Sequence, residues 1–421
     1  MTRPLVSAPE PRKKPSQKIA PKLRDGVMKR GNTWSYVIRV KDPETGESKP
    51  KWVGGFATED EAKAARDEAR VSARRGEYVD RNAISVGEYL DEWIEAHAVE
   101  IKPKTLKDYR DIINRYVKPH IGGQKLQAVR PATITKLYRD LMAGGGKNGR
   151  KLSARTIDYV HAVLRKAFRD AVEVDQVLAS NPVERAKRPR RTPAEPGSVW
   201  TPEQLRAFLA VARRHRLFAF FHLAAYTGAR RGELLNLRWS SVNLDACDIT
   251  ITGSAAFIDG ERIEGTTKTG RTRVISIDQS TVQALKAHRK QQAADKLLAG
   301  EEWRGAGDHV FTTGWGEPIH PDTVSSLMPI LIKRYNAPKN APKPAEPLPH
   351  ARLHDLRHIH ATTLLLAGVP VHVVAARLGH VDPSITLRVY AHVIRAAEAS
   401  AAEIFSNAIE AGEGRNPPIG K

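Results

Sequence analysis

A stretch rich in proline and basic residues divides this chain and limits how it can fold. The sequence RAKRPRRTPAEPGS, residues 185–198, holds three prolines and five basic residues and follows a long run of helical periodicity. Proline removes a backbone donor and breaks a helix, so no single helical body can run through this stretch. The chain has 421 residues, enough for two or three domains. We therefore predict an interdomain linker at 187–198 with globular regions on both sides.

The charge of the chain indicates a polyanionic partner. Lysine and arginine outnumber aspartate and glutamate by 68 to 47, which gives a formal net charge of +21. Such a chain attracts nucleic acid or an anionic membrane. No run of about 18 apolar residues is present, and charged residues and prolines stand where a signal peptide requires an apolar core. We expect a soluble, unexported protein without a membrane partner.

The cysteine content and the glycine-rich loop limit the cofactors that we expect. The single cysteine, Cys247, cannot form an internal disulfide, a thiolate zinc site or an iron-sulfur cluster. The loop GGGKNGRK at 144–151 lacks the Gly-Lys-Ser/Thr order of a nucleotide-binding loop. We therefore expect an inert thiol in a reducing cytoplasm, no metal and no cofactor.

The first 80 residues combine a basic arm with a small mixed domain. Residues 1–25 carry seven basic side chains, Lys13 and Lys14 among them, interleaved with prolines. We predict a disordered arm that either contacts phosphates or only keeps the chain soluble. Residues 26–80 then predict two strands joined by a turn and a helix that starts with a capping box of Thr58 and Glu61. A domain of this size suits a module that binds a DNA groove. The plainer reading is a cap that only supports folding.

Residues 84–186 have the periodicity of a helical domain. Helices are predicted at 85–97, 105–117, 131–142 and 153–172. In the second helix one apolar stripe is formed by Leu106, Tyr109, Ile113, Tyr116 and Val117. We expect these tyrosines in the core.

Basic residues at the edges of the helical region are candidates for contact with phosphates. The candidates in the glycine-rich loop and the linker are Lys147, Arg150, Lys151, Arg188, Arg190 and Arg191. A flexible basic linker would let the two halves close around a duplex as a clamp. The plainer reading is a stiff spacer that separates the two halves.

Residues 199–411 predict a mixed, mostly helical domain, followed by a tail at 412–421. Thr201 caps a helix whose first position is Pro202, and a helix-turn-helix pattern covers 220–244. Strands at 248–253 and 271–278 flank the turn TTKTG, which exposes Lys268 at a hairpin end. The whole chain is thus expected to be a mainly α, multidomain α+β protein with small β-sheets.

Four motifs follow one another in the C-terminal half. They are TGARRGELLNLRW at 227–239, TKTGRTRVISI at 267–277, LHDLRHIHATTLL at 353–365 and LGHVDPSITLRVYAHV at 378–393. Together they resemble the catalytic domain of tyrosine recombinases of the phage-integrase type. By layout, 84–186 resembles the core-binding domain of that family and 26–80 its arm-binding domain. The Ala-rich end of 199–411 resembles the C-terminal helix that the family exchanges between protomers, although a helix packed in cis is also open.

The family pattern assigns roles to particular residues. The catalytic positions that it matches are Arg230, Lys268, His354, Arg357, His380 and Tyr390. Breaking a phosphodiester without metal requires a nucleophile, cations on the phosphate oxygens and an acid for the leaving oxygen. Tyr390 matches the nucleophile, Lys268 matches the general acid, and Glu233 is expected to orient Arg230.

Plainer explanations exist for these residues. Arg230 and Arg231 could be a solvated charge pair, and HDLRH at 354–358 is one step from the zinc motif HExxH, with an arginine that would oppose a metal. An arbitrary tyrosine in an apolar helix is more often a packing residue of the core than a catalytic residue. Tyr390 follows His380 by ten residues, one more than is common in the family, and we expect the extra residue in the loop VDPS.

The resemblance implies a site-specific DNA recombinase. Such an integrase cleaves and rejoins strands through a 3′-phosphotyrosine, integrating or excising a mobile element such as a phage. Its partners would be double-stranded DNA attachment sites, a homotetramer on DNA, a directionality factor and a host DNA-bending protein, in the bacterial cytoplasm at the nucleoid. The alternative is a DNA-binding accessory or regulatory protein that does not use the catalytic residues.

The basic arm gives a first test. Replacing Lys13 and Lys14 by alanine should weaken binding to every DNA sequence, because fewer counterions are released from phosphates. Binding constants measured over a series of salt concentrations should show a flatter salt dependence than the wild type. An unchanged slope would remove the arm from the interface.

Overall fold

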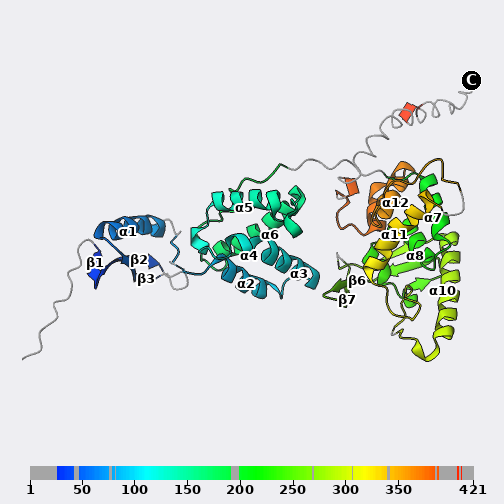
Figure 1. Ribbon diagram of the computed structural model, residues 1–421, viewed down its shortest axis with the longest axis horizontal. Coiled ribbons are helices and arrows are strands. Elements are labelled where there is room, and N and C mark those ends of the chain that lie inside the picture. Colours follow the sequence, from blue (N-terminus) through cyan, green and yellow to red (C-terminus); the bar gives the residue numbers. More distant parts are fainter. Residues whose placement is uncertain are drawn as a thin grey trace, which may run out of the picture. The chain divides into compact units, whose positions relative to one another are not determined.

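The chain divides into two compact units, Met1–Thr192 and Pro193–Lys421. Figure 1 shows the helices and strands of both. The computed structural model describes residues 26–41, 47–74, 78–80, 82–190, 199–267, 270–305, 307–338, 342–384, 386–387, 405–406 and 409. The predicted site residues outside these ranges are Lys13, Lys14, Arg191, Lys268 and Tyr390. The predicted arm, the tail and most of the C-terminal exchange helix also lie outside them. No helix within the described ranges is long and apolar enough to cross a membrane.

A three-stranded antiparallel sheet with one helix opens the first unit. Its elements are β1 (Val27–Arg30), β2 (Thr33–Lys41), β3 (Ser48–Phe56) and α1 (Glu59–Arg74), with strand order β1-β2-β3. Tyr36 and Ile38 alternate into a small core with Phe56 and Ala62. The capping box is confirmed, since the Glu61 backbone N–H donates to Thr58 Oγ1 over 3.2 Å. Sequence analysis missed β1, because four residues carry too short a pattern.

A helical bundle with its own core completes the described part of this unit. Its helices are α2 (Val86–His97), α3 (Pro103–Ile112), a π-helical turn (Ile113–Val117), α4 (Lys118–Ile121), α5 (Pro131–Gly144) and α6 (Ala154–Glu173). The four helices predicted from periodicity are confirmed. Ile113 and Val117 are fully buried, while Leu106, Tyr109 and Tyr116 pack against the core from its margin.

The second unit is mostly helical and contains small sheets. Its helices are α7 (Pro202–Ala212), α8 (Phe218–Thr227), α9 (Arg231–Leu235), α10 (Gln279–Ala299), α11 (Pro321–Asn336), α12 (Asp355–Leu366) and α13 (Val371–Leu378). Its strands are β4 (Val242–Asn243), β5 (Asp248–Ile251), β6 (Gly253–Ile258), β7 (Glu261–Thr266) and β8 (Arg273–Ser276). Strands β4, β5 and β8 form one antiparallel sheet, and β6 and β7 form a separate pair. The predicted mainly helical α+β fold is confirmed.

The strand before the predicted turn differs from the expectation. Residues 248–253 were expected to lead directly into that turn, but β6 and β7 stand in between, and β5 pairs with β8. The missed hairpin of β6 and β7 turns at Asp259 and Gly260, both with positive φ. An Asp-Gly pair between two short strands is a strong hairpin signal, so the sequence did contain the information.

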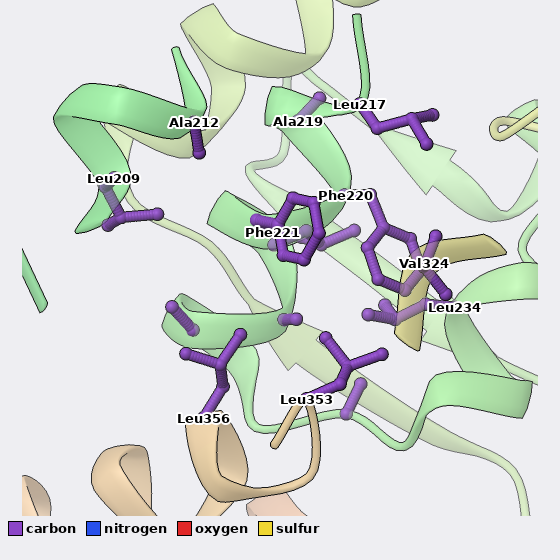
Figure 2. Close-up of a cluster of buried hydrophobic side chains, with 14 of the residues drawn as sticks. Leu209, Ala212, Leu217, Ala219, Phe220, Phe221, Leu234, Val324, Leu353 and Leu356 are labelled. Carbon is purple, nitrogen blue, oxygen red and sulfur yellow. The ribbon is translucent and has the colours of Figure 1, made fainter. Parts of the chain in front are cut away.

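Helix α8 is the centre of the second unit. Nearly all of its side chains are buried, which marks a helix enclosed on all sides. Figure 2 shows Phe220 and Phe221 of α8 surrounded by Leu209 of α7, Val324 of α11 and Leu353 before α12. The core therefore ties together the elements that carry the first arginine motif and the His-x-x-Arg motif.

Removing an aromatic ring from this core should destabilise the second unit. Phe221 is 0% exposed, so Phe221→Ala should lower the free energy of unfolding by about 3–5 kcal/mol through lost burial and a residual cavity. Urea unfolding measures the change. Leu297→Ala is the matched control: that side chain is 84% exposed, and a change above about 0.5 kcal/mol is not expected there.

Candidate active site

A glycine ends α8 two residues before Arg230. Gly228 has φ +64°, and a Cβ on it would lie 2.7 Å from Leu378 Cδ2 and 2.9 Å from His360 Cδ2. Other residues would be strained in backbone and blocked by these neighbours. The tight turn lets Arg230 stand as the N-cap of α9 beside the end of α13. The Thr-Gly pair of the motif thus sets the position of Arg230.

Arg230 is held by a buried carboxylate. Its backbone N–H donates to Glu233 Oε2 over 2.8 Å, and its Nη1 donates to Glu233 Oε1 over 2.8 Å. The Glu233 side chain is 1% exposed. Burial by itself would raise the pKa of Glu233, but Arg273 and then Arg230 outweigh it through hydrogen bonds and charge, so the pKa is lowered. Glu233 is therefore an anion at neutral pH.

The two adjacent arginines point in different directions. Arg231 Nη1 donates to Ser325 Oγ over 2.6 Å and lies near Asp322 of α11. The Arg230 side chain is 23% exposed, compared with 43% for Arg231. They do not form the solvated pair that the sequence left open.

Arg357 is buried under the same site. It is 4% exposed, and its Nη1 and Nη2 donate to the carbonyls of Gly228 and Leu378, each over 2.8 Å. These carbonyls end α8 and α13, so one guanidinium joins both helix ends to α12. A lysine could not span two acceptors in this way.

His380 follows the last turn of α13 and lies against Arg357. Its Nε2 is 2.8 Å from Arg357 Nη2, and its Nδ1 is 2.7 Å from the Oγ1 of buried Thr386. A guanidinium only donates, so Nε2 accepts, and the neutral ring donates from Nδ1 to Thr386. Burial, followed by the charges of Arg357 and Arg230, lowers the pKa of His380 to about 4. The ring is neutral at pH 7.

His354 stands at the start of α12, within the field of the same arginines. Burial, then His358 and Arg357, lowers its pKa to about 4. The His354 and His358 rings are nearly perpendicular, with centroids 5.2 Å apart. At neutral pH His354 is thus an unprotonated imidazole that can accept a proton.

The structure brings four of the six predicted catalytic residues together with Glu233. They are Arg230, His354, Arg357 and His380. Lys268 and Tyr390 lie outside the described residues; β7 ends at Thr266 and β8 begins at Arg273. The chain becomes helical at Pro383, where the sequence suggested the start of a helix.

Two residues of this site, Arg273 and Thr386, were not predicted from the sequence. Arg273 donates to Glu233, and Thr386 accepts from His380. Each lies inside one of the four motifs, and this position was the sequence feature that could have marked it as part of the site. Neither has a distinctive spacing from its partner.

The predicted phosphate-contacting residues that are described lie in the first unit. Arg150, Lys151 and Arg190 have exposed side chains, and Lys147 belongs to a short 3-10 turn (Lys147–Gly149). Arg188 is also exposed and approaches Asp158 of α6 at 3.5 Å. Their role in binding stays a prediction.

Two arginines meet at one point of a mostly helical domain with a histidine beside them, and guanidinium groups can bind the oxygens of a phosphodiester. The sequence matches the family described as "Phage integrase family" over residues 198–396. It also matches "Phage integrase, N-terminal SAM-like domain" over 85–142 and "Arm DNA-binding domain" over 27–72. The chain belongs to the phage-integrase family of tyrosine recombinases.

Named relatives agree with this family. The chain is 29% identical over 369 residues to a "Tyrosine recombinase XerC-like" of Caldanaerobacter subterraneus, covering 83% of this chain and 90% of the relative. It is 25% identical over 340 residues to the "ICEBs1 integrase" of Bacillus subtilis, covering 80% and 85%. It is 27% identical over 330 residues to the integrase of Mycobacterium phage L5, covering 77% and 80%.

Solved structures share the fold. The Tn1549 transposon integrase in complex with transposon right end DNA has a TM-score of 0.63 at 20% identity, covering 76% of this chain and 100% of that one. A lambda integrase tetramer bound to a Holliday junction has a TM-score of 0.52 at 18% identity, covering 88% and 96%.

The lowered histidine pKa values predict how stability depends on pH. In the unfolded chain these histidines bind protons near pH 6.5, whereas in the folded protein His354 and His380 bind them only near pH 4. The free energy of unfolding should therefore be unaffected by these groups above about pH 6.5 and should fall as the pH drops toward 4. In His380→Gln the slope of the unfolding free energy against pH should decrease by up to one proton across this window. Urea unfolding at several pH values measures the slope. His372→Gln, on an exposed side chain of α13, is the matched control, and an unchanged slope in His380→Gln would contradict the assignment.

Proposed function

We propose that this tyrosine recombinase performs site-specific recombination with the six residues that its motifs single out. The observation that carries the proposal is the cluster of Arg230, Arg357 and His380, built from three distant segments around Glu233. Arg357 is fixed by backbone carbonyls, and Arg230 by a carboxylate. Such preorganised cations stabilise charge that develops on a phosphate in the transition state.

In the proposed cleavage step the phenol oxygen of Tyr390 attacks phosphorus, and the bond from phosphorus to the 5′ oxygen breaks. His354, neutral at pH 7, accepts the phenol proton. The departing 5′ oxygen takes a proton from Lys268. Arg230 and Arg357 hold the non-bridging oxygens. We propose His380 as the last phosphate contact on the family pattern. To donate to the phosphate, its ring must carry the proton on Nε2 and release the contact with Arg357. The DNA 3′ end is left as a phosphotyrosine.

Rejoining is the reverse reaction with a new 5′ hydroxyl. That hydroxyl attacks the phosphorus and gives its proton to Lys268. The bond from phosphorus to Tyr390 breaks, and His354 returns a proton to the phenol oxygen. One phosphate ester replaces another in each step, so the energy of the broken bond is kept and no nucleotide is hydrolysed.

The partners follow from the relatives and from charge. The Tn1549 integrase structure contains transposon DNA, and the lambda integrase structure is a tetramer on a Holliday junction. For this chain we propose double-stranded attachment sites, a homotetramer on DNA, and integration or excision of a mobile element. The net charge of +21 supports binding along duplex DNA. A directionality factor and a host DNA-bending protein are the proposed accessory partners.

A suicide substrate tests the proposed chemistry. The core site can be identified from the DNA that flanks the gene, and a nick beside the cleavage position traps the covalent adduct. The wild type should form a protein–DNA adduct that resists denaturant, whereas Tyr390→Phe should bind with similar affinity and form none. An adduct with the phenylalanine variant would exclude Tyr390 as nucleophile. Binding without any adduct from the wild type would instead favour the accessory DNA-binding function.

A further inference from the structure

Arg273 forms the second half of the ion-pair network under Arg230. Its Nη2 lies 2.7 Å from Glu233 Oε2, and its Nη1 lies 3.2 Å from Glu233 Oε1, which is a bidentate pair. The Arg273 side chain is 12% exposed. The carboxylate of Glu233 therefore binds two arginines at once, one from β8 and one from the start of α9.

Arg273 also contacts the turn that precedes His380. Its Nε donates to the carbonyl of Arg377 over 3.1 Å. Gly379, with φ +69°, leaves room for the guanidinium, since a Cβ there would lie 2.8 Å from Arg273 Nη1. The planar group thus fills the space between Glu233 and the end of α13.

Arg273 lies in the sheet close in sequence to Lys268. It is the first residue of β8, five residues after Lys268, and is paired with Ile251 of β5. One side chain therefore joins the strand that follows the proposed general acid to the helix ends that present Arg230 and His380.

The geometry leaves one side of Arg230 available for a ligand. Arg230 uses its backbone N–H and Nη1 on Glu233, while its Nη2, among the residues that the structure describes, makes only a 3.4 Å contact with the Gly379 carbonyl. With Arg273 filling the remaining sites of the carboxylate, Glu233 cannot take both guanidinium nitrogens of Arg230. Without Arg273, the buried carboxylate would draw Arg230 into a bidentate pair and away from the phosphate.

We infer that Arg273 is a positioning residue that keeps Arg230 turned toward the scissile phosphate by sharing Glu233. This inference rests on the proposed function, because it assigns Arg230 to the phosphate. It differs from a purely structural role in its prediction that cleavage is impaired while DNA binding and folding are retained.

The first experiment separates the rate of cleavage from binding. Single-turnover cleavage of the suicide substrate at saturating protein should slow on the order of 10–100-fold in Arg273→Gln, with an unchanged dissociation constant for DNA. Arg273→Lys should be intermediate, because an ammonium pairs with one carboxylate oxygen but not with both. Assays below the unfolding temperature of every variant keep the comparison among folded proteins, and Arg273→Lys serves if Arg273→Gln does not fold.

Arg271→Gln is the matched control for charge. Its side chain is exposed two residues earlier in the same segment, so the same charge is lost without contact to Glu233. Its cleavage rate at saturating protein should equal that of the wild type. A wild-type rate in Arg273→Gln, or an equal loss in Arg271→Gln, would overturn the inference.

A second substrate distinguishes action through Arg230 from action through Lys268. A sulfur in place of the 5′ bridging oxygen leaves as a thiolate, which needs no proton from a general acid. The cleavage defect of Arg273→Gln should persist on this substrate. Rescue of the rate would show that Arg273 acts through Lys268 instead.

The double variant Glu233→Gln with Arg273→Gln should cleave no more slowly than Glu233→Gln alone, since both residues act through one network. If the wild type forms no adduct, the proposed function fails; if only the Arg273 variants behave as wild type, this inference alone fails.

Discussion

The buried carboxylate of Glu233 is the interaction on which the cationic site depends. Like charges at close range repel, by about 4 kcal/mol at about 4 Å and an effective dielectric constant of about 20, and Arg230 and Arg273 both contact the same carboxylate. The carboxylate between them, 1% exposed, turns that repulsion into two ion pairs. Burying it without both partners would leave a desolvated charge. The network therefore places two cations side by side at the site that we propose for the phosphate.

The backbone at two helix ends also positions the cationic residues. Gly228 and Gly379 end α8 and α13 in left-handed conformations with no space for a Cβ, and the carbonyls of Gly228 and Leu378 accept from Arg357. These helix ends meet because α8 is enclosed by the apolar core of the second unit. The packing of the core thus fixes the helix ends, and the helix ends hold cationic groups that would otherwise repel one another.

Much of the fold and part of the site could be predicted from local patterns. Helical periodicity predicted the bundle of the first unit, and capping signals predicted the starts of α1 and α7. The hairpin of β6 and β7 was missed although its Asp-Gly turn was visible. Arg273 was missed for a different reason: its partner is 40 residues away, and nothing in either local sequence indicates the pairing. The roles of all six candidate catalytic residues and the domain boundaries stay predictions.

The sequence by itself determined the family, the mainly helical fold and the set of candidate catalytic residues, because these follow from motifs, spacing and local propensity. Only the tertiary structure decided which of two adjacent arginines faces inward, which nitrogen of His380 carries the proton, and which arginine shares Glu233. Each of these depends on contacts between segments far apart in the chain. Burial and hydrogen-bond geometry choose among side chains that are chemically equivalent in the sequence.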